Sequence, residues 1–260
     1  MARCDPACRA SSRSFLRCSI RASVPKTSPY PYFDSIKNSM ATPYLQIFTS
    51  DVPSTQDLAM GKLESLPVAV IAPSQSGGRG RSGSRWDNAD RALAVSVAWL
   101  VADEDRRPFS LMAGVAAVRA LDGGSVLKWP NDVMRGETKV GGILVERSDQ
   151  GIVAGLGLNL FWAEPPEGVG AVFDHDPGLE AHREIGALWV AELMAQIDTG
   201  GWPADEYREA CTTLGRSITW EPNGEGIAAG ISERGALLVE TESGIEEIHA
   251  GAVRHVRTDH

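Results

Sequence analysis

The chain contains little cysteine and no long apolar run. Only four of its 260 residues are cysteine, and three of these lie in the first 18 residues, which leaves Cys211 alone in the rest. A single cysteine cannot form a disulfide framework, so we expect a protein of a reducing compartment with a cytoplasmic location. The early cysteines have no histidine near them and do not indicate a zinc site. No apolar run reaches about 18 residues, so no membrane span is expected.

Positive charge is scarce after residue 39. Residues 1–39 hold seven basic and two acidic side chains, whereas the remainder holds 18 basic and 32 acidic ones. Proteins that bind nucleic acid without sequence preference use a positive surface to displace counterions from phosphates. The acidic main part of the chain therefore argues against a nucleic-acid partner.

The first 39 residues lack the apolar periodicity of a folded domain. Ser14–Val24 has no continuous apolar core, which excludes a secretory signal. The segment is rich in serine and arginine and poor in acids, as in an organelle transit peptide. Alternatively, translation starts at Met40, and we favour this second interpretation. We predict a disordered N-terminal extension at 1–39, with no room for a winged-helix DNA-binding domain.

From residue 40 the pattern predicts an α+β fold. Ser54 is the expected N-cap of a helix through Leu63, and Pro108 begins a helix that reaches about Leu121. The expected strands are Tyr44–Thr49, Val68–Ala72, Ala92–Val101, Val126–Trp129, Val133–Met134, Gly142–Glu146 and Ile152–Leu160. The last three are joined by short turns, which predicts an antiparallel meander rather than parallel βαβ units.

The C-terminal part changes from helices to short strands. Apolar residues at helical spacing predict a helix at about His182–Asp198, and a second helix, Ala204–Leu214, is expected to end at Gly215. After Ser217 short strands alternate with turns, which predicts a small β-barrel. We therefore divide the chain into the extension, a main domain at 40–214 and a barrel at 215–260.

A glycine- and arginine-rich loop follows the strand at Val68–Ala72. Gly78–Gly83 matches the G-x-G-x-x-G pattern of dinucleotide-binding folds, and Asp103 lies about twenty residues further on. Such a fold needs a helix of several turns directly after the glycines. Only eight residues separate Gly83 from the next strand at Ala92, so this interpretation fails.

The same loop suits an anionic ligand. Its glycines let the backbone approach a ligand closely and leave amide N–H groups free to bind it. Arg79, Arg81 and Arg85 add positive charge for phosphate contacts, and Trp86 offers a face on which a purine can stack. The alternatives are a solvated turn or an RGG-like nucleic-acid contact, which fits poorly with one copy between two buried strands.

A second cluster of polar residues ends a predicted strand. Lys128–Asp132 brings together a cation, an aromatic ring, an amide and a carboxylate, and Lys139 follows on the next hairpin. Charged groups at the ends of apolar strands are seldom only structural, because burying them unpaired costs free energy. Lys128, Trp129 and Pro130 have the alternative role of shaping the turn.

Taken together, these segments resemble the biotin protein ligase family. The resemblance runs from Asp51 to the C-terminus with order and spacing in agreement. It is carried by Ser54-Thr55, by Gln75 with GGRGRSGSRW (Gly77–Trp86), by KWPNDV (Lys128–Val133), by KVGGILVE (Lys139–Glu146) and by GLGLNL (Gly155–Leu160).

The resemblance implies a fold, a reaction and a partner. The implied fold is a mixed, largely antiparallel sheet flanked by helices, like that of class II aminoacyl-tRNA synthetases, with a C-terminal SH3-like barrel. The implied reaction joins biotin and MgATP into biotinyl-5′-AMP, then transfers biotin to a lysine of a biotin carboxyl carrier protein domain. The implied type is a monofunctional ligase, and an exposed sheet edge makes a homodimer possible.

The resemblance also implies roles for individual residues. Arg79, Lys139 and Asp132 are the expected catalytic residues, with Lys139 neutralising the oxygens that meet during adenylation and Asp132 orienting or deprotonating the incoming lysine. No side chain is assigned to a dedicated metal site, although Asn131 is a candidate for holding phosphate or Mg²⁺. Biotin or its adenylate is expected to contact Ser54, Thr55, Gln56, Gln75, Arg79, Gly80, Arg81, Lys139 and Gly142, and ATP or adenine to contact Trp86, Asn131 and Asn159.

The sequence departs from the family pattern at a few places. Gln56 stands where asparagine is commoner, Ser84 replaces a frequent arginine, and Asp87–Arg91 lacks the usual Pro/Gly-rich run. Two other functions stay open at this point. One is a lipoate or octanoate protein ligase on the same fold, and the other is a binding module without catalytic activity.

Overall fold

The computed structural model describes residues 17–19, 42–121, 123–249 and 253–255. Most of the segment 1–39 lies outside these residues, so its predicted disorder stays a prediction. Within it, β1 (Arg17–Ser19) pairs in antiparallel fashion with β2 (Leu45–Phe48).

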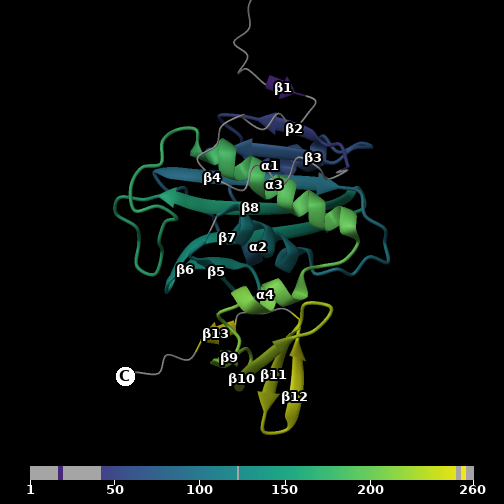
Figure 1. Ribbon diagram of the computed structural model, residues 1–260, viewed down its shortest axis with the longest axis vertical. Coiled ribbons are helices and arrows are strands. Elements are labelled where there is room, and N and C mark those ends of the chain that lie inside the picture. The colour runs from purple at the N-terminus through teal and green to yellow at the C-terminus, as the bar shows by residue number, and fades with distance from the viewer. Residues whose placement is uncertain (1–16, 20–41, 122, 250–252, 256–260) are drawn as a thin grey trace, which may run out of the picture.

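A mixed sheet of eight strands forms the centre of the molecule (Figure 1), in the order β1-β2-β3-β4-β8-β7-β6-β5. Only the β2–β3 pair is parallel among the pairs in this sheet, so the predicted antiparallel meander is confirmed. The strands beyond β2 are β3 (Val68–Ala72), β4 (Arg91–Trp99), β5 (Ser125–Lys128), β6 (Asp132–Arg135), β7 (Thr138–Ser148) and β8 (Gly151–Phe161).

One face of the sheet is covered by α2 (Phe109–Ala120) and α3 (Ala181–Thr199), which cross in front of the strands in Figure 1. Alternate residues of β4 and β8, such as Leu93 and Leu156, point into the main core beneath these helices. Trp189 of α3 is fully buried there, as predicted, and its indole N–H donates to the Ala113 carbonyl at 3.0 Å.

In the part of the chain that the structure describes, the opposite face carries one short helix. This helix, α1 (Thr55–Gly61), is capped by Ser54, whose Oγ accepts a hydrogen bond from the Asp57 amide. It packs on a second, smaller apolar cluster that includes Ala59, Val70 and Val153. Because seven residues cannot cover a sheet of this width, part of this face stays open beside α1.

Two predicted helix ends were wrong. The helix that begins after Ser54 ends at Gly61 rather than Leu63. The second late helix, α4 (Ala204–Ala210), ends four residues before Leu214. Cys211 leaves the helix in an extended conformation, and the Thr212 amide instead donates to the Leu127 carbonyl of β5. A local helical pattern could not predict this contact with a distant strand.

The C-terminal strands form a separate five-stranded antiparallel sheet in the order β12-β11-β10-β9-β13. It lies at the lower end of the molecule in Figure 1, below α4. Residues such as Ala228 and Val239 are buried on one side of this sheet, and Ile227 and Ile245 are exposed on the other. The strands are β9 (Ser217–Trp220), β10 (Gly224–Ile231), β11 (Leu237–Thr241), β12 (Gly244–Ile248) and β13 (Val253–His255).

The turn between β10 and β11 joins this sheet to the main domain. The Trp129 indole N–H donates to the Gly235 carbonyl at 3.0 Å, and that of Trp202 donates to the Glu233 carbonyl at 2.9 Å. A Cβ at Gly235 would lie 2.5 Å from Pro108, so this turn sits directly on the start of α2. Trp129 therefore has the structural role that the sequence left open.

We expect Trp129→Phe to lower the free energy of unfolding by about 1 kcal/mol more than Trp99→Phe does. Trp129 and Trp99 are equally buried, at 2% and 3% exposure, and both substitutions remove the same atoms. Only Trp129 donates its indole hydrogen to a described acceptor, and a lost hydrogen bond typically costs about 1 kcal/mol. Guanidinium unfolding of both variants measures this difference, and equal losses would contradict it.

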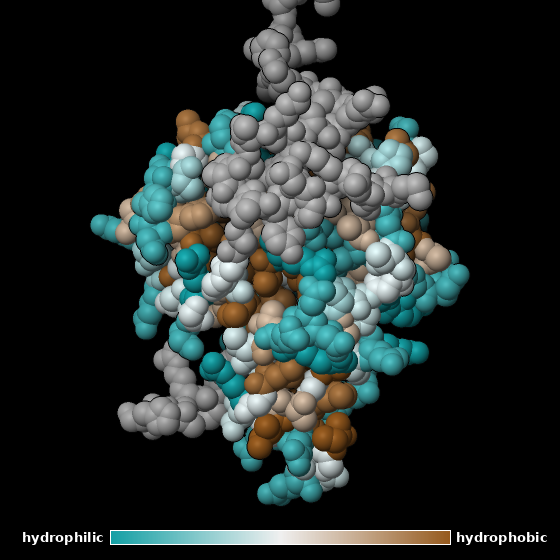
Figure 2. Space-filling view, viewed as in Figure 1, coloured by the Kyte–Doolittle hydropathy of each residue, from teal (hydrophilic) through white to brown (hydrophobic). Residues whose placement is uncertain are grey.

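Figure 2 shows apolar groups among hydrophilic ones over the C-terminal sheet at the lower end of the molecule. Among the described residues, no helix is both long enough and apolar enough to cross a membrane.

Candidate functional site

A cavity of about 840 Å³ occupies the open face of the sheet beside α1. Its floor is formed by β7 and β8, and the Arg-Gly loop (Gly77–Trp86) and the segment from Trp162 to Val169 supply its walls. The cavity collects nearly all the residues that the sequence predicted to bind ligand. The exception is Ser54, which does not line the cavity and instead caps α1.

Three glycines leave part of the cavity floor without side chains. Gly142 of β7 lies directly opposite Gly157 of β8, and Gly155 lies opposite Leu144. Because strand residues alternate between faces, Gly155, Gly157 and Asn159 all point into the cavity, about 7 Å apart along β8. A Cβ at Gly155 would approach Gln56 and Ser96 to about 3 Å, and one at Gly157 would lie 2.9 Å from the Trp86 ring.

One end of the cavity is polar but uncharged. The Gln75 Oε1 atom accepts from the Thr55 amide at 2.6 Å and from the Thr55 hydroxyl at 3.0 Å. The same hydroxyl lies 2.8 Å from the Ser96 Oγ. The Asn88 side chain fixes Gln75 in turn. Its Oδ1 accepts from the backbone amide of Gln75, and its side-chain amide donates to the backbone carbonyl of Gln75. Such a network of donors and acceptors suits a neutral polar ring rather than a charged group.

Sequence reasoning missed Ser96 and Asn88. Ser96 had a visible signal, because it is the one polar residue in the apolar stretch from Ala92 to Trp99. Asn88 had none, since only the folded loop brings its side chain to the backbone of Gln75.

The Arg-Gly loop folds as a tight turn over the cavity. The Gly80 amide donates to the Ser84 carbonyl at 2.7 Å, and the Trp86 amide donates to the Gly78 carbonyl at 3.0 Å. A Cβ at Gly80 would meet the Ser84 Oγ, so a side chain there would make Ser84 adopt another rotamer. No helix follows, as the sequence predicted.

Arg79 is held by two carboxylates that the sequence did not single out. Its guanidinium donates to both oxygens of Asp57, at 2.8 and 2.6 Å, and to Glu146 at 3.3 Å. These hydrogen bonds from Arg79 hold the pKa of the Asp57 carboxyl below its usual value. Arg79 thus lines the cavity with its charge already paired.

The other end of the cavity carries two further cations, Lys139 and Arg81. Lys139 Nζ lies 2.6 Å from Asp132 Oδ1, and Arg81 donates to Asn131 Oδ1 at 3.2 Å without an ion pair to any described residue. The Asn131 side-chain amide donates to the Ile143 carbonyl at 3.0 Å, which fixes its orientation. The predicted group Arg81, Asn131, Asp132 and Lys139 is therefore assembled at one place.

Trp86 and Asn159 lie on the same floor. The Trp86 indole rests over Gly142 and Gly157. Asn159 is 2% exposed and donates to the Gly170 carbonyl at 3.0 Å, but its Oδ1 has no hydrogen-bond partner among the described residues. An unpaired buried acceptor is rare in proteins, and this one belongs to a residue that lines the cavity.

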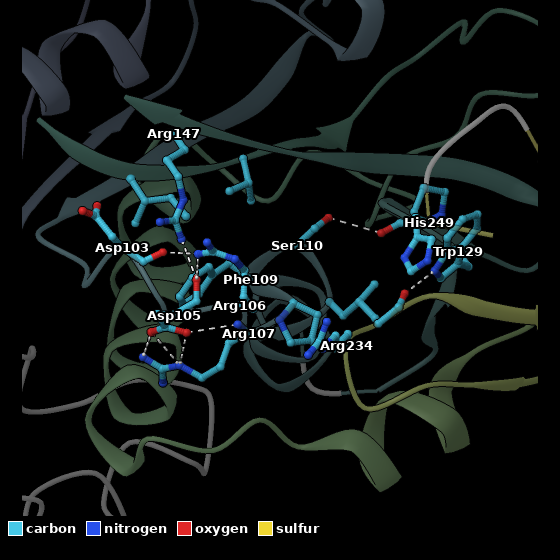
Figure 3. Close-up of a pocket in the computed structure, with 16 residues that line it drawn as sticks. Asp103, Asp105, Arg106, Arg107, Phe109, Ser110, Trp129, Arg147, Arg234 and His249 are labelled. Carbon is cyan, nitrogen blue, oxygen red and sulfur yellow. Dashed lines mark hydrogen bonds and ion pairs between the residues drawn. The ribbon is translucent and has the colours of Figure 1, made fainter. Parts of the chain in front are cut away.

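A second hollow of about 710 Å³ lies where the C-terminal sheet meets the main domain (Figure 3). Arg107 pairs there with the Asp105 carboxylate at 2.8 Å, and Arg147 donates to the Asp105 backbone carbonyl at 2.9 Å. Arg234 and His249 lie apart from this cluster, near Trp129. The predicted site residues are absent from this hollow, so we place the chemistry in the first cavity.

Comparisons with known proteins agree with this geometry. Residues 49–160 match the family described as "Biotin/lipoate A/B protein ligase family", and residues 213–256 match the "Biotin protein ligase C terminal domain". The chain is 31% identical over 211 residues to a biotin–[acetyl-CoA-carboxylase] ligase of Mycobacterium tuberculosis, covering 73% of this chain and 79% of the relative. It is 29% identical to the corresponding ligase of Paracoccus denitrificans, covering 71% and 88%.

A solved structure shows the same fold. It is the biotin protein ligase of Aquifex aeolicus in complex with biotin and ATP, with a TM-score of 0.70 and 27% identity. The match covers 82% of this chain and 99% of that protein. The predicted fold class, including the small C-terminal β domain, is confirmed.

Proposed function

Because this chain belongs to the biotin protein ligase family, we propose that its cavity activates biotin with ATP and transfers it to a lysine of a carboxylase. The observation that carries this proposal is the order of groups along β8. Gly155 faces the neutral polar end, Gly157 faces Trp86 and Asn159 presents its free acceptor. These positions span about 14 Å, which suits an elongated ligand with a neutral ring at one end and a purine at the other.

The uncharged end of the cavity is the proposed place of the biotin ring. A ureido group carries N–H donors and one carbonyl acceptor, and the Thr55, Gln75 and Ser96 network offers both kinds of partner. The glycine floor lets the ring and its chain lie close to the sheet. Lipoate has no ureido group, so it would make none of these donor and acceptor contacts.

The cationic end is the proposed place of adenylation. The biotin carboxylate attacks the α-phosphorus of ATP, the bond to the bridging oxygen of the leaving group breaks, and pyrophosphate departs with those electrons. Two anionic groups must meet in this step, and Lys139 and Arg81 supply the charge that lowers their repulsion. Asp132 holds the Lys139 ammonium in place through the 2.6 Å contact.

Trp86 and Asn159 are the proposed contacts of adenine. The ring of Trp86 offers stacking, and the free Oδ1 of Asn159 is suited to the 6-amino group of the purine.

The second step transfers the acyl group. The lysine amine of the acceptor attacks the acyl carbon, the acyl–phosphate bond breaks, and AMP leaves. The amine must lose a proton, and Asp132 at the cavity wall is the proposed group that orients or accepts it. The acceptor we propose is a biotin carboxyl carrier protein domain, since relatives are named as acetyl-CoA-carboxylase ligases.

Magnesium is expected to arrive with ATP rather than in a cage of protein ligands. Among the described residues no group of three His, Cys, Asp or Glu side chains lies close enough to hold a metal. The Asn131 oxygen already accepts from Arg81. Mg²⁺ usually keeps several waters and binds through nucleotide phosphates, so its charge would assist pyrophosphate departure.

The test is the biotin-dependent exchange of labelled pyrophosphate into ATP. We expect exchange with biotin and none with lipoate, because only biotin carries the ureido group that the Thr55, Gln75 and Ser96 network can bind. Binding of biotin without exchange would instead indicate a module without catalytic activity, and exchange with lipoate would indicate the rival ligase. The homodimer and the cytoplasmic location stay predictions.

A further inference from the structure

Arg79 is tied to two separate elements of the main domain. Asp57 lies on α1 and Glu146 lies on β7, while Arg79 itself belongs to the Arg-Gly loop. The pairing with Asp57 uses two N–H groups in parallel, which is the strongest geometry available to a guanidinium. The two carboxylates more than balance the single positive charge of Arg79, and the hydrogen bonds of its guanidinium go to these two side chains.

Glu146 is itself fixed by a further contact. The Gln56 amide donates to the same Glu146 oxygen at 3.0 Å that Arg79 contacts. Gln56 fits there because Gly155 has no side chain, as a Cβ would lie 3.0 Å from the Gln56 Oε1. These contacts therefore connect the loop, through Glu146 and Gln56, to the floor of the cavity.

The loop has few other ties to the rest of the protein. The Gly77 amide donates to the Pro53 carbonyl, and Arg81 donates to Asn131. Apart from those of Arg79, the remaining hydrogen bonds of Gly78–Ser84 among the described residues stay within the loop itself. The ion pairs of Arg79 therefore connect the middle of the loop to the cavity wall on the α1 side.

We propose that Asp57 and Glu146 are positioning residues that latch the Arg-Gly loop through Arg79 and so retain the activated intermediate in the cavity. Neither carboxylate needs to touch the ligand, since both act on the loop that covers it. The retention part rests on the proposed function, whereas the latch itself is a property of the ligand-free protein.

The latch can be measured without any reaction. Trypsin cleaves after arginine, and besides Arg79 itself the loop offers Arg81 and Arg85. We expect Asp57→Asn and Glu146→Gln each to speed cleavage at these two sites about threefold, and the double variant about tenfold, as followed by mass spectrometry. Glu180→Gln is the matched control, because it breaks the exposed ion pair of Glu180 with Arg183 away from the cavity. Equal cleavage rates in all variants would overturn the latch.

A double-mutant comparison separates the latch from general loosening. If Asp57 acts through Arg79, Asp57→Asn should add nothing to the cleavage rate of Arg79→Ala. An additive effect would mean that Asp57 stabilises the loop in another way and would contradict the proposal.

Retention is measured by biotin-dependent AMP formation without an acceptor. An intermediate that escapes reacts with water at its acyl carbon, which gives biotin and AMP. We expect the double variant to form AMP about tenfold faster than the wild type while pyrophosphate exchange changes little. Faster cleavage by trypsin with unchanged AMP formation would overturn retention. Absence of exchange in the wild type would refute the proposed function and leave the trypsin result to decide the latch.

Discussion

Lys139→Ala should reduce biotin-dependent pyrophosphate exchange by at least about 100-fold. This is the scale of losing one preorganised electrostatic contact of ~3 kcal/mol in a catalytic site. The expected loss is large for two reasons. The carboxylate and the phosphate lose the cation that reduces their repulsion, and Asp132 loses the ammonium held 2.6 Å from its Oδ1. The uncompensated Asp132 charge then repels both reacting groups.

The second reason leads to a sharper test. Replacing Asp132 by asparagine in the Lys139→Ala background should restore part of the exchange, because it removes the unpaired negative charge. Lys128→Ala is the control, since Lys128 ends β5 and does not line the cavity. We expect it to lose less than about fivefold. Near-normal exchange in Lys139→Ala, or an equal loss in Lys128→Ala, would contradict the role assigned to Lys139.

The sequence predicted the strands of the main domain well because their local patterns agree with the fold. Val68–Ala72 was predicted to the residue, and the short turns of the meander specified which strands pair. The end of α4 was not predictable in the same way. Cys211 and Thr212 lie beyond the end of the helix and contact β5, a strand more than 80 residues earlier in the chain.

The candidate site was predicted through its motifs and missed where partners come from distant elements. Arg79, Lys139 and Asp132 were named from their own segments. Asp57 and Glu146 were not, since each looks like an ordinary exposed acid in its helix or strand. Their importance appears only when the loop brings the Arg79 guanidinium between them.

Gly157→Ala should raise the KM for ATP about 30-fold with little change in biotin affinity. A Cβ at Gly157 would lie 2.9 Å from Trp86 Cε2, closer than real contacts allow, and the indole is too rigid to bend away. The ring must therefore shift as a whole and carry the proposed adenine platform with it. Overpacking of this kind typically costs about 2 kcal/mol, which corresponds to the expected factor. The biotin end should be spared, because its contacts surround Gly155 rather than Gly157.

Gly142→Ala provides the matched control across the strand pair. Gly142 lies opposite Gly157 under the same indole, but a Cβ there would stand 3.4 Å from Trp86 Cζ3. That distance requires a displacement of a few tenths of an ångström at most, so the KM for ATP should rise less than about fivefold. Steady-state exchange at varied ATP, with biotin binding measured by calorimetry, separates the two variants. If Gly157→Ala weakened biotin and ATP equally, Trp86 would not be the part of the cavity that binds the nucleotide.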